Sequence, residues 1–297
     1  MYFPVADIHV SPWIPPLVAF AISFFTSMGG VSGAFLLLPF QISCLGYDSP
    51  SVSATNHIFN IVAIPSGVYR YIREGRMVWP LTWAVIIGTL PGVLAGSVIR
   101  VRYLPDPTSF KRFAALVLLY IGVRLLRDIF KASRRSPATA PPAAEGSEAR
   151  VTDQRFTLRT ISYTFRGRHH TVSTAGIMTL SLTVGIIGGV YGIGGGAIIA
   201  PFFVSFFGLP VYTVAGAALM GTMITSFAGV TFFQLMAPFY PTMAIAPDWK
   251  LGILFGIGGF IGMYCGARAQ RFVPARLIKS ILAFCILYTG LHYLGLY

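Results

Sequence analysis

Charged side chains are scarce in this chain of 297 residues, where they make up 10 % of the composition. Soluble globular proteins carry about 25 % charged residues, so a water-soluble fold is excluded. Hydrophobic residues reach 55 %, in a series of apolar segments of which several are shorter than the roughly 20 residues of a straight crossing. We therefore predict an all-α polytopic membrane protein that has the lipid bilayer as its surroundings.

Cysteine is also rare. The three cysteines, Cys44, Cys265 and Cys285, stand alone in apolar stretches, without the C-x-x-C spacing of zinc sites or redox disulfides. We expect no disulfide, no metal and no cofactor. The N-terminal sequence MYFPVADIHV lacks a basic n-region, so no cleavable signal peptide is predicted.

Acidic residues are absent between Asp153 and Asp248, and lysine is absent between Lys131 and Lys250. The second gap leaves the glycine-rich stretch near residue 195 without the G-K-[ST] of a nucleotide-binding loop. No H-x-x-x-H, G-x-S-x-G or paired intramembrane carboxylate occurs, so an enzyme is not expected. The net charge of +13 lies mostly beside the apolar segments, where it orients a membrane protein, and no nucleic-acid partner is expected.

Glycine, in contrast, is abundant, with 32 residues, and its positions reveal an internal duplication. A shift of 162 positions places Gly30–Pro39 (GVSGAFLLLP) on Gly192–Pro201 (GIGGGAIIAP). The same shift matches two further pairs, Gly46 with Gly208 and Gly67 with Gly229. A chance local match would not persist over so long a stretch.

A second glycine pattern recurs every four residues in each copy. It comprises Gly88, Gly92 and Gly96 in the first copy and Gly258, Gly262 and Gly266 in the second. This spacing lets membrane helices approach closely. We divide the chain into a first membrane repeat (1–126), a linker (127–174) and a second membrane repeat (175–297).

The linker is polar and basic. Its proline-rich first part, SPATAPPAAEGSE, has the composition of a disordered segment. Residues 155–173 alternate apolar and polar side chains around the turn Arg166–Arg168 and predict a small β-hairpin. Short basic loops favour the cytoplasm, so we expect a cytoplasmic linker.

Charge also predicts how the two repeats are oriented. The loop 237–249 has no Lys or Arg, whereas residues 268–279 are basic, which assigns these two segments to opposite sides of the membrane. With an odd number of full crossings in each repeat, the second copy is inverted relative to the first. Both termini are then expected outside. The basic residues Arg100, Arg102, Lys111 and Arg112 also fall on the outer side in this arrangement and count against it, so a parallel pair of repeats is the alternative.

Each matched glycine stretch interrupts an apolar helix and exposes backbone groups that lipid cannot satisfy. Secondary transporters bring two such breaks together near the bilayer midplane. The helices that are predicted to start near Gly195, and near Ser32 and Gly33, would then point their positive N-terminal ends at an anion. The alternative is that the glycines only permit tight helix packing.

The duplicated G-x-x-G and G-I-G-G-G breaks resemble the sulfite exporter TauE/SafE family, because a proline follows six residues after the last matched glycine in each copy, at Pro39 and Pro201. The resemblance spans nearly all membrane segments. It implies a permease with two homologous halves that moves a small anion, such as sulfite, sulfoacetate or a related organosulfur compound. Ser32 and Ala34 depart from the second copy, as does the long linker from the family.

Polar side chains at membrane depth are costly unless they face a cavity or a partner. Four of them, Ser53, Asn56, His57 and Asn60, fall on one helical side. The Asn and Ser side chains would donate hydrogen bonds to an oxyanion, and His57 could carry a coupling proton. Alternatively, His57 hydrogen-bonds a neighbouring helix.

The predicted substrate-binding residues combine the two breaks, the polar side of the helix and its second-repeat counterparts. They are Gly30, Gly33, Pro39, Ser53, Asn56, His57, Asn60, Gly192, Gly194, Gly195, Gly196, Pro201, Thr222, Thr225 and Ser226. The hydroxyls of the second repeat could instead bond their own helix backbone. We expect a secondary transporter of a small anion in a bacterial cytoplasmic (inner) membrane, with a passive anion channel as the alternative.

Overall fold

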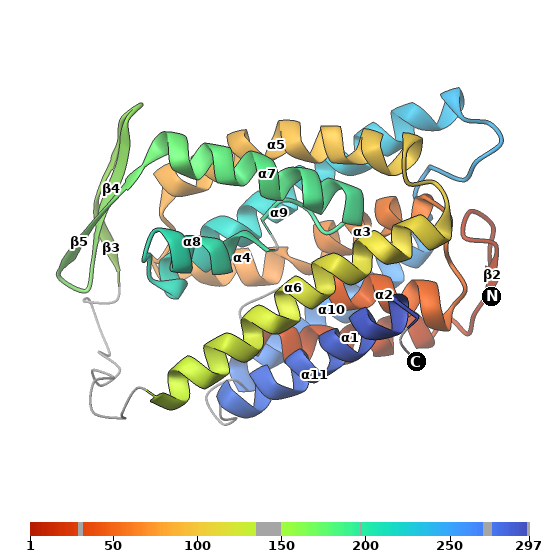
Figure 1. Ribbon diagram of the computed structural model, residues 1–297, viewed down its shortest axis with the longest axis horizontal. Coiled ribbons are helices and arrows are strands. Elements are labelled where there is room, and N and C mark those ends of the chain that lie inside the picture. Colours follow the sequence, from red (N-terminus) through yellow and green to blue (C-terminus); the bar gives the residue numbers. More distant parts are fainter. Residues whose placement is uncertain (29–31, 135–149, 197, 270–274, 296–297) are drawn as a thin grey trace.

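The computed structural model describes residues 1–28, 32–134, 150–196, 198–269 and 275–295. It is a bundle of helices with a small β-sheet at one end (Figure 1). The N-terminal strands β1 and β2 and the last turn of α11 lie at the opposite end (Figure 1). We call these two ends of the bundle the sheet end and the terminal end.

The first repeat contains a short hairpin and six helices. Their bounds are β1 Tyr2–Phe3, β2 Ile8–His9, α1 Ile14–Met28, α2 Ala34–Cys44, α3 Ser51–Ala63, α4 Pro65–Arg73, α5 Trp79–Arg102 and α6 Pro107–Arg134. Pro65 ends α3 and begins α4, because proline lacks the N–H of a helix interior but suits a first turn. Helix α6 continues to Arg134, past residue 126, which we predicted as the end of the first membrane repeat.

The second repeat follows the sheet. The bounds are β3 Val151–Phe156, β4 Thr160–Phe165, β5 Arg168–Ser173, α7 Thr174–Tyr191, α8 Ile199–Phe206, α9 Val211–Met236, η3 Ala237–Phe239, α10 Trp249–Ala269 and α11 Ala275–Tyr293. Side-chain N-caps stabilise the first turn of two of these helices. The Ser173 hydroxyl accepts from the N–H of Gly176 at α7, and the Asp248 carboxylate accepts from the N–H of Leu251 at α10.

Among the described residues, four helices are long and apolar enough to cross a membrane by length and composition. These are Trp79–Arg102, Thr174–Tyr191, Val211–Phe239 and Trp249–Ala269. The described residues also include three shorter apolar helices of 10–17 residues, Ile14–Met28, Ala34–Cys44 and Ser280–Tyr293. The expectation of a polytopic helical membrane protein is therefore confirmed.

The glycine-rich helix of each repeat packs against a helix of the other repeat. A side chain at Gly88, Gly92 or Gly96 of α5 would overlap α7, at or beside the backbone of Met178, Leu182 and Ile186. In the other half, a side chain at Gly258, Gly262 or Gly266 of α10 would overlap the backbone of α1 at Pro16, Phe20 and Phe24. The shift of 162 that relates the repeats converts each contacted residue of α1 into its counterpart on α7. Each glycine helix thus packs on the first helix of the other repeat.

Helices α6 and α11 form a third reciprocal contact. A side chain at Gly122 would overlap Leu287, and one at Gly290 would meet Leu119 at 3.1 Å. Position 122 corresponds to 290 and position 119 to 287, so one contact is the repeat-related copy of the other. The residue numbers rise along one helix as they fall along the other, so the two equivalent helices run antiparallel (Figure 1).

The β-hairpin in the linker is confirmed, and a third strand extends it. Strands β4 and β5 pair antiparallel around Arg166 and Gly167, which both have positive φ, and β3 adds to the other edge of β4. The buried side chains are Ile161, Tyr163, Phe165 and Val172. Phe156 and Leu158 do not share this face, since they are 52 % and 88 % exposed.

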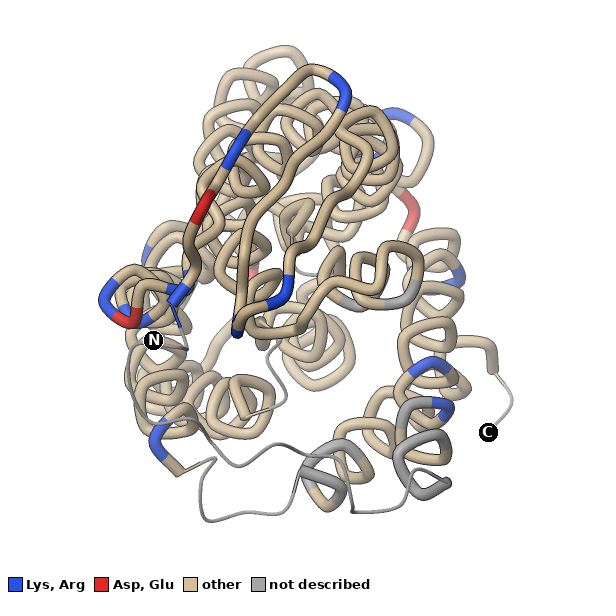
Figure 2. The backbone as a smooth tube through the Cα atoms, turned by 90° about the vertical axis from the view of Figure 1, so that its left-hand side faces the viewer, with Lys and Arg blue, Asp and Glu red and all other residues tan. Residues whose placement is uncertain are grey.

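The sheet is fastened to both repeats. Gln154 accepts a hydrogen bond from the N–H of Trp79 at 2.8 Å and donates one to the carbonyl of Met77 at 3.2 Å. The Tyr163 hydroxyl contacts that of Thr213 on α9 at 2.8 Å. Seen from this end, the sheet covers one part of the bundle and carries several arginines (Figure 2).

Candidate functional site

The second glycine stretch ends α7 and delays the start of α8. Gly192 and Gly194 have φ of +76° and +74°, a left-handed conformation that glycine adopts without steric cost. The N–H groups of Gly192 and Ile193 both turn back to the carbonyl of Gly188. Helix α8 therefore begins at Ile199, and the prediction that it starts near Gly195 is wrong.

The first glycine stretch lies only partly within the described residues. Gly30 is outside them, and Gly33 is the N-cap of α2, as expected for a helix that starts near Ser32 and Gly33. A side chain at Gly33 would meet the Ser23 hydroxyl of α1 at 3.0 Å. The beginning of α2 is thus packed directly on the preceding helix.

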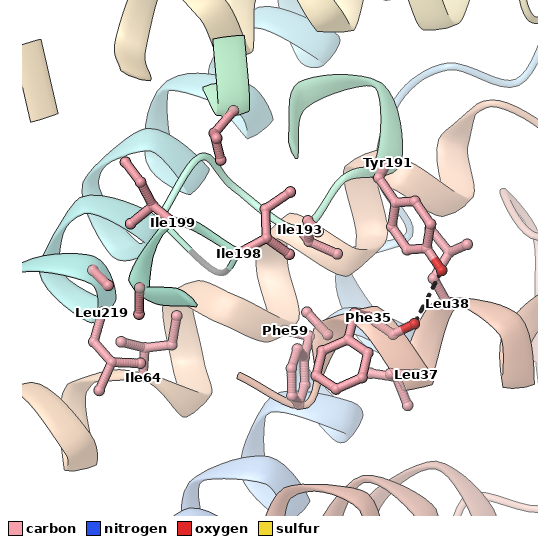
Figure 3. Packing of buried hydrophobic residues seen from close by; sticks show 14 of the residues in the cluster. Phe35, Leu37, Leu38, Phe59, Ile64, Tyr191, Ile193, Ile198, Ile199 and Leu219 are labelled. Atoms are coloured by element: carbon pink, nitrogen blue, oxygen red, sulfur yellow. Dashed lines mark hydrogen bonds between the residues drawn. The ribbon is translucent and has the colours of Figure 1, made fainter. Parts of the chain in front are cut away.

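The two prolines lie inside the short helices. Pro39 has no N–H to offer the carbonyl of Phe35 one turn earlier, and this carbonyl instead accepts the hydroxyl of Tyr191 at 3.0 Å (Figure 3). Pro201 lies in the first turn of α8. Through Pro39, the end of α7 in the second repeat is tied to α2 in the first.

Two asparagines of α3 bridge both breaks. Asn56 donates hydrogen bonds from its side-chain amide to the carbonyls of Ala34 and Gly192, each at 3.1 Å. Asn60 accepts from the hydroxyl of Ser32 at 3.0 Å and donates to the carbonyl of Ile193 at 3.1 Å. Both side chains are fully buried.

Ser53 continues the same side of α3 toward the terminal end. Its hydroxyl donates to the carbonyl of Val190 at 3.2 Å and accepts from the Nε of Arg100 at 3.4 Å. The side chains of Ser53, Asn56 and Asn60 therefore donate hydrogen bonds to three carbonyls at the end of α7, those of Val190, Gly192 and Ile193. In this conformation their donors are occupied by backbone oxygens, the same type of acceptor that an oxyanion would offer.

His57 faces α9 instead of the breaks. Its Nδ1 lies 3.1 Å from the hydroxyl of Ser226, and its ring fills the space beside Gly229. Its Nε2 is buried and has no hydrogen-bond partner within the described ranges. The alternative in which His57 contacts a neighbouring helix describes this geometry, and one ring nitrogen remains available for a proton.

Two of the predicted second-repeat hydroxyls, those of Thr222 and Thr225, are turned toward their own helix, whereas that of Ser226 contacts His57. Thr222 donates to the carbonyl of Ala218 and Thr225 to that of Gly221. Thr225 also accepts from the N–H of Gly195 at 3.3 Å, so it holds the break in place. A side chain at Gly196 would overlap the carbonyl of Ala218.

The residues that contact the site but were not among the predicted ligands include Ser32, Tyr191 and Arg100. Ser32 was noted only as a departure from the second copy, and Arg100 only as a basic residue on the outer side. Arg100 is fully buried. The apolar residues around Tyr191 in the sequence did not predict its contact with the site, because the carbonyl that it hydrogen-bonds to, that of Phe35, lies 156 positions away.

Chemically, the site offers amide and hydroxyl donors, one imidazole and one guanidinium. No group of three or more His, Cys, Asp or Glu side chains that could hold a metal ion occurs among the residues described. Hydrogen-bond donors and a cation without a carboxylate partner suit an oxyanion better than a cation.

These features define a class: a mostly helical membrane protein, with four candidate spans among the described residues. The chain belongs to the sulfite exporter TauE/SafE family, a family of membrane transporters, because residues 16–293 match the family model described as "Sulfite exporter TauE/SafE". It is also 28 % identical over 107 residues to "Probable membrane transporter protein YdhB" of Bacillus subtilis (strain 168). That alignment covers 36 % of this chain and 40 % of the relative. No solved structure matches the chain.

Proposed function

We propose that the protein is a secondary transporter of a small anion, sulfite or a related organosulfur anion, which works by alternating access around the two breaks. The observation that carries this proposal is the pair of asparagines. Asn56 and Asn60 each hydrogen-bond to the first break and to the second. Any movement of one break relative to the other must therefore rearrange the hydrogen bonds of these two side chains.

The chemistry of binding follows from those hydrogen bonds. The amide groups of Asn56 and Asn60 now donate to the carbonyls of Gly192 and Ile193. An oxyanion that enters between α3 and the end of α7 would accept the same donors. Because each buried carbonyl that loses its donor must find another partner, substrate binding is coupled to rearrangement of the break.

Dense packing around the breaks supports a transporter over the passive channel. A side chain at Gly192 would overlap the backbone of Ser53, and one at Gly196 would overlap that of Ala218. A channel needs a continuous path, whereas alternating access includes conformations in which the middle is closed. The central polar side chains Asn56, His57 and Asn60 are all fully buried.

Inverted repeats are part of the proposal. The antiparallel contact of α6 with α11, two helices at equivalent positions of the repeats, supports a two-fold axis in the membrane plane. Burial of Arg100 removes one cation that counted against this orientation. The sheet end, with its basic linker, then faces the cytoplasm, and both termini face outward. A reporter fused to the C-terminus tests this orientation, which a cytoplasmic signal would contradict.

His57 is our proposed carrier of a coupling proton. Its imidazole lies between the two repeats, with Nδ1 at Ser226 and Nε2 without a partner among the described side chains. Protonation would place a charge beside Gly229, where α3 packs on α9. Repacking of these helices would link proton binding to movement.

Purified protein in liposomes tests the proposal. Sulfite flux should saturate with concentration and rise with an imposed proton gradient, and it should fall when an uncoupler removes that gradient. Unsaturable flux that ignores the gradient would favour the channel. Thermal stabilisation by sulfite, thiosulfate, sulfoacetate, sulfate and carboxylates then ranks the substrates, and the absence of both flux and stabilisation with every anion would overturn the proposed function.

A further inference from the structure

Arg100 is the largest fully buried side chain among the described residues. It lies near the end of α5, in one of the four candidate spans. A charged group in this position is costly and usually marks a functional site. Its neighbour Arg102, two residues further on, is exposed, so the chain end of α5 does not force Arg100 inward.

The partners of Arg100 leave its charge without a counterion. Nε donates to the hydroxyl of Ser53 at 3.4 Å, Nη1 donates to the carbonyl of Leu104, and the guanidinium lies 3.8 Å from the centre of the Phe110 ring. Nη2 is buried and has no hydrogen-bond partner in the part of the chain that the structure describes. The exposed Asp48 attracts the charge from beyond ion-pair distance.

A purely structural role explains only part of this arrangement. Capping the end of α5 uses one N–H, the bond from Nη1 to Leu104, and stacking on Phe110 uses the face of the guanidinium. Neither requires a second terminal nitrogen to be buried without an acceptor. Leaving a buried charge without a partner is strongly unfavourable, and an anion bound at Nη2 would relieve that cost.

Arg100 is also connected to the site. It donates to Ser53, whose hydroxyl holds the carbonyl of Val190 directly before the second break. One turn further along α3, Asn56 holds Gly192, and Asn60 follows one turn later. Arg100, Ser53, Asn56 and Asn60 thus form a row from the terminal end of the bundle to the point where both breaks meet.

We propose that Arg100 is the anion-binding residue at the terminal-end entrance of the transport site, where its Nη2 takes an oxygen of a small oxyanion such as a sulfite or sulfonate group. This inference rests on the proposed function and deepens it. The guanidinium attracts the anion and passes it to the amide donors of Asn56 and Asn60. Because the attraction depends on charge, lysine replaces it in part and glutamine does not.

The test compares Arg100→Gln and Arg100→Lys with the matched control Arg102→Gln, which removes an exposed cation of the same helix end. Sulfite transport is measured in liposomes, with KM and kcat determined separately, and thermal unfolding is followed with and without sulfite. We expect Arg100→Gln to raise KM by about tenfold or more, as for loss of a charge-assisted hydrogen bond. Arg100→Lys should raise it less, and Arg102→Gln should leave it unchanged.

Other outcomes separate the two proposals. If wild-type protein transports sulfite and Arg100→Gln has the wild-type KM, the role of Arg100 is wrong while the transporter stands. Equal losses of kcat in both Arg100 variants with KM unchanged would also contradict it, since they indicate a structural role. If Arg100→Gln does not fold, Arg100→Lys decides through its KM. If the wild type neither transports nor binds any anion tested, the proposed function itself fails.

Discussion

The two repeats share a framework but divide the chemistry between them. Helix α3 of the first repeat supplies the polar side chains, whereas the equivalent part of α9 is small or apolar. In order along the helices, the pairs are Ser53 and Ala215, Asn56 and Ala218, His57 and Leu219, and Asn60 and Thr222. The second repeat in turn supplies the backbone carbonyls of its break, which accept from the side chains of the first.

This comparison teaches that symmetry of packing and symmetry of function are separate. Reciprocal contacts position the helices: His57 packs on Gly229, and its repeat-related residue Leu219 packs on Gly67, which corresponds to Gly229. The same pair places an imidazole on one side and an aliphatic side chain on the other. The following changes break or sharpen the comparison, beginning with the largest expected effect.

Gly196→Ala should be the most damaging change. The added methyl group would overlap the carbonyl of Ala218 and the hydroxyl of Thr222, and overpacking of this kind costs about 3 kcal/mol. We expect a large fall in the apparent Tm and loss of transport. The equivalent residue is already Ala34, so Ala34→Gly is the matched control and should cost about 1 kcal/mol. Equal effects of the two variants would mean that the breaks are packed alike.

Asn56→Ala should nearly abolish transport while the fold persists. It removes the two buried hydrogen bonds that Asn56 donates, to Ala34 and Gly192, and the one that it accepts from Gln41. The two donated bonds are each worth about 1 to 1.5 kcal/mol, which corresponds to a roughly 100-fold lower kcat/KM. Sulfite flux in liposomes is the measurement. The exposed amide of Gln234 on α9 provides the control, since Gln234→Ala should transport normally. A variant at Asn56 with normal flux would remove the bridge between the breaks from the mechanism.

His57→Leu makes the first repeat resemble the second at this position. We expect proton-driven sulfite uptake to fall by about 100-fold, the lower end of the range for loss of a proton-transferring side chain, whereas exchange of sulfite without a gradient persists. His292→Leu, which removes an exposed histidine of α11, should change neither rate. Unaltered proton-driven uptake in His57→Leu would assign the coupling elsewhere.

Gln154→Ala should have the smallest effect. It removes the two hydrogen bonds that fasten the sheet to Met77 and Trp79, and each contributes about 1 kcal/mol. Hydrogen exchange of residues 150–173 should become faster, with little change in the exchange of α5. The exposed Thr152→Ala is the control. Identical exchange in both variants would mean that other contacts, such as those of Tyr163 with Thr213 and of Val151 with Gly75, hold the sheet.

Much of the fold could be predicted from the sequence because its signals are periodic. The four-residue spacing of Gly88, Gly92 and Gly96 predicted close helix contact, and these glycines do pack on α7. The alternation around Arg166 predicted the hairpin. The start of α8 could not be located from the glycines alone, since left-handed residues at Gly192 and Gly194 lengthen the break.

The candidate site was less accessible to sequence reasoning. Asn56 and Asn60 were expected to face the transport path, but their partners at Gly192 and Ile193 lie 136 and 133 positions away. Whether such a side chain meets solvent, substrate or backbone depends on tertiary packing between the repeats. The burial of Arg100 is a case of the same kind, because it depends on Ser53 and Phe110 from two other helices.

The reciprocal packing of the glycine-rich helices between the repeats also bears on the evolutionary origin of the chain. In a symmetric dimer, if residue i of one copy contacts residue j of the other, then j contacts i. The contacts of α5 with α7 and of α10 with α1 have this form within a single chain. Such an interface is what two antiparallel copies of one ancestral subunit would make, and fusion of their genes would have released each copy to change independently. The polar side chains of α3 in the first repeat and the glycines of the second break would then both result from that divergence.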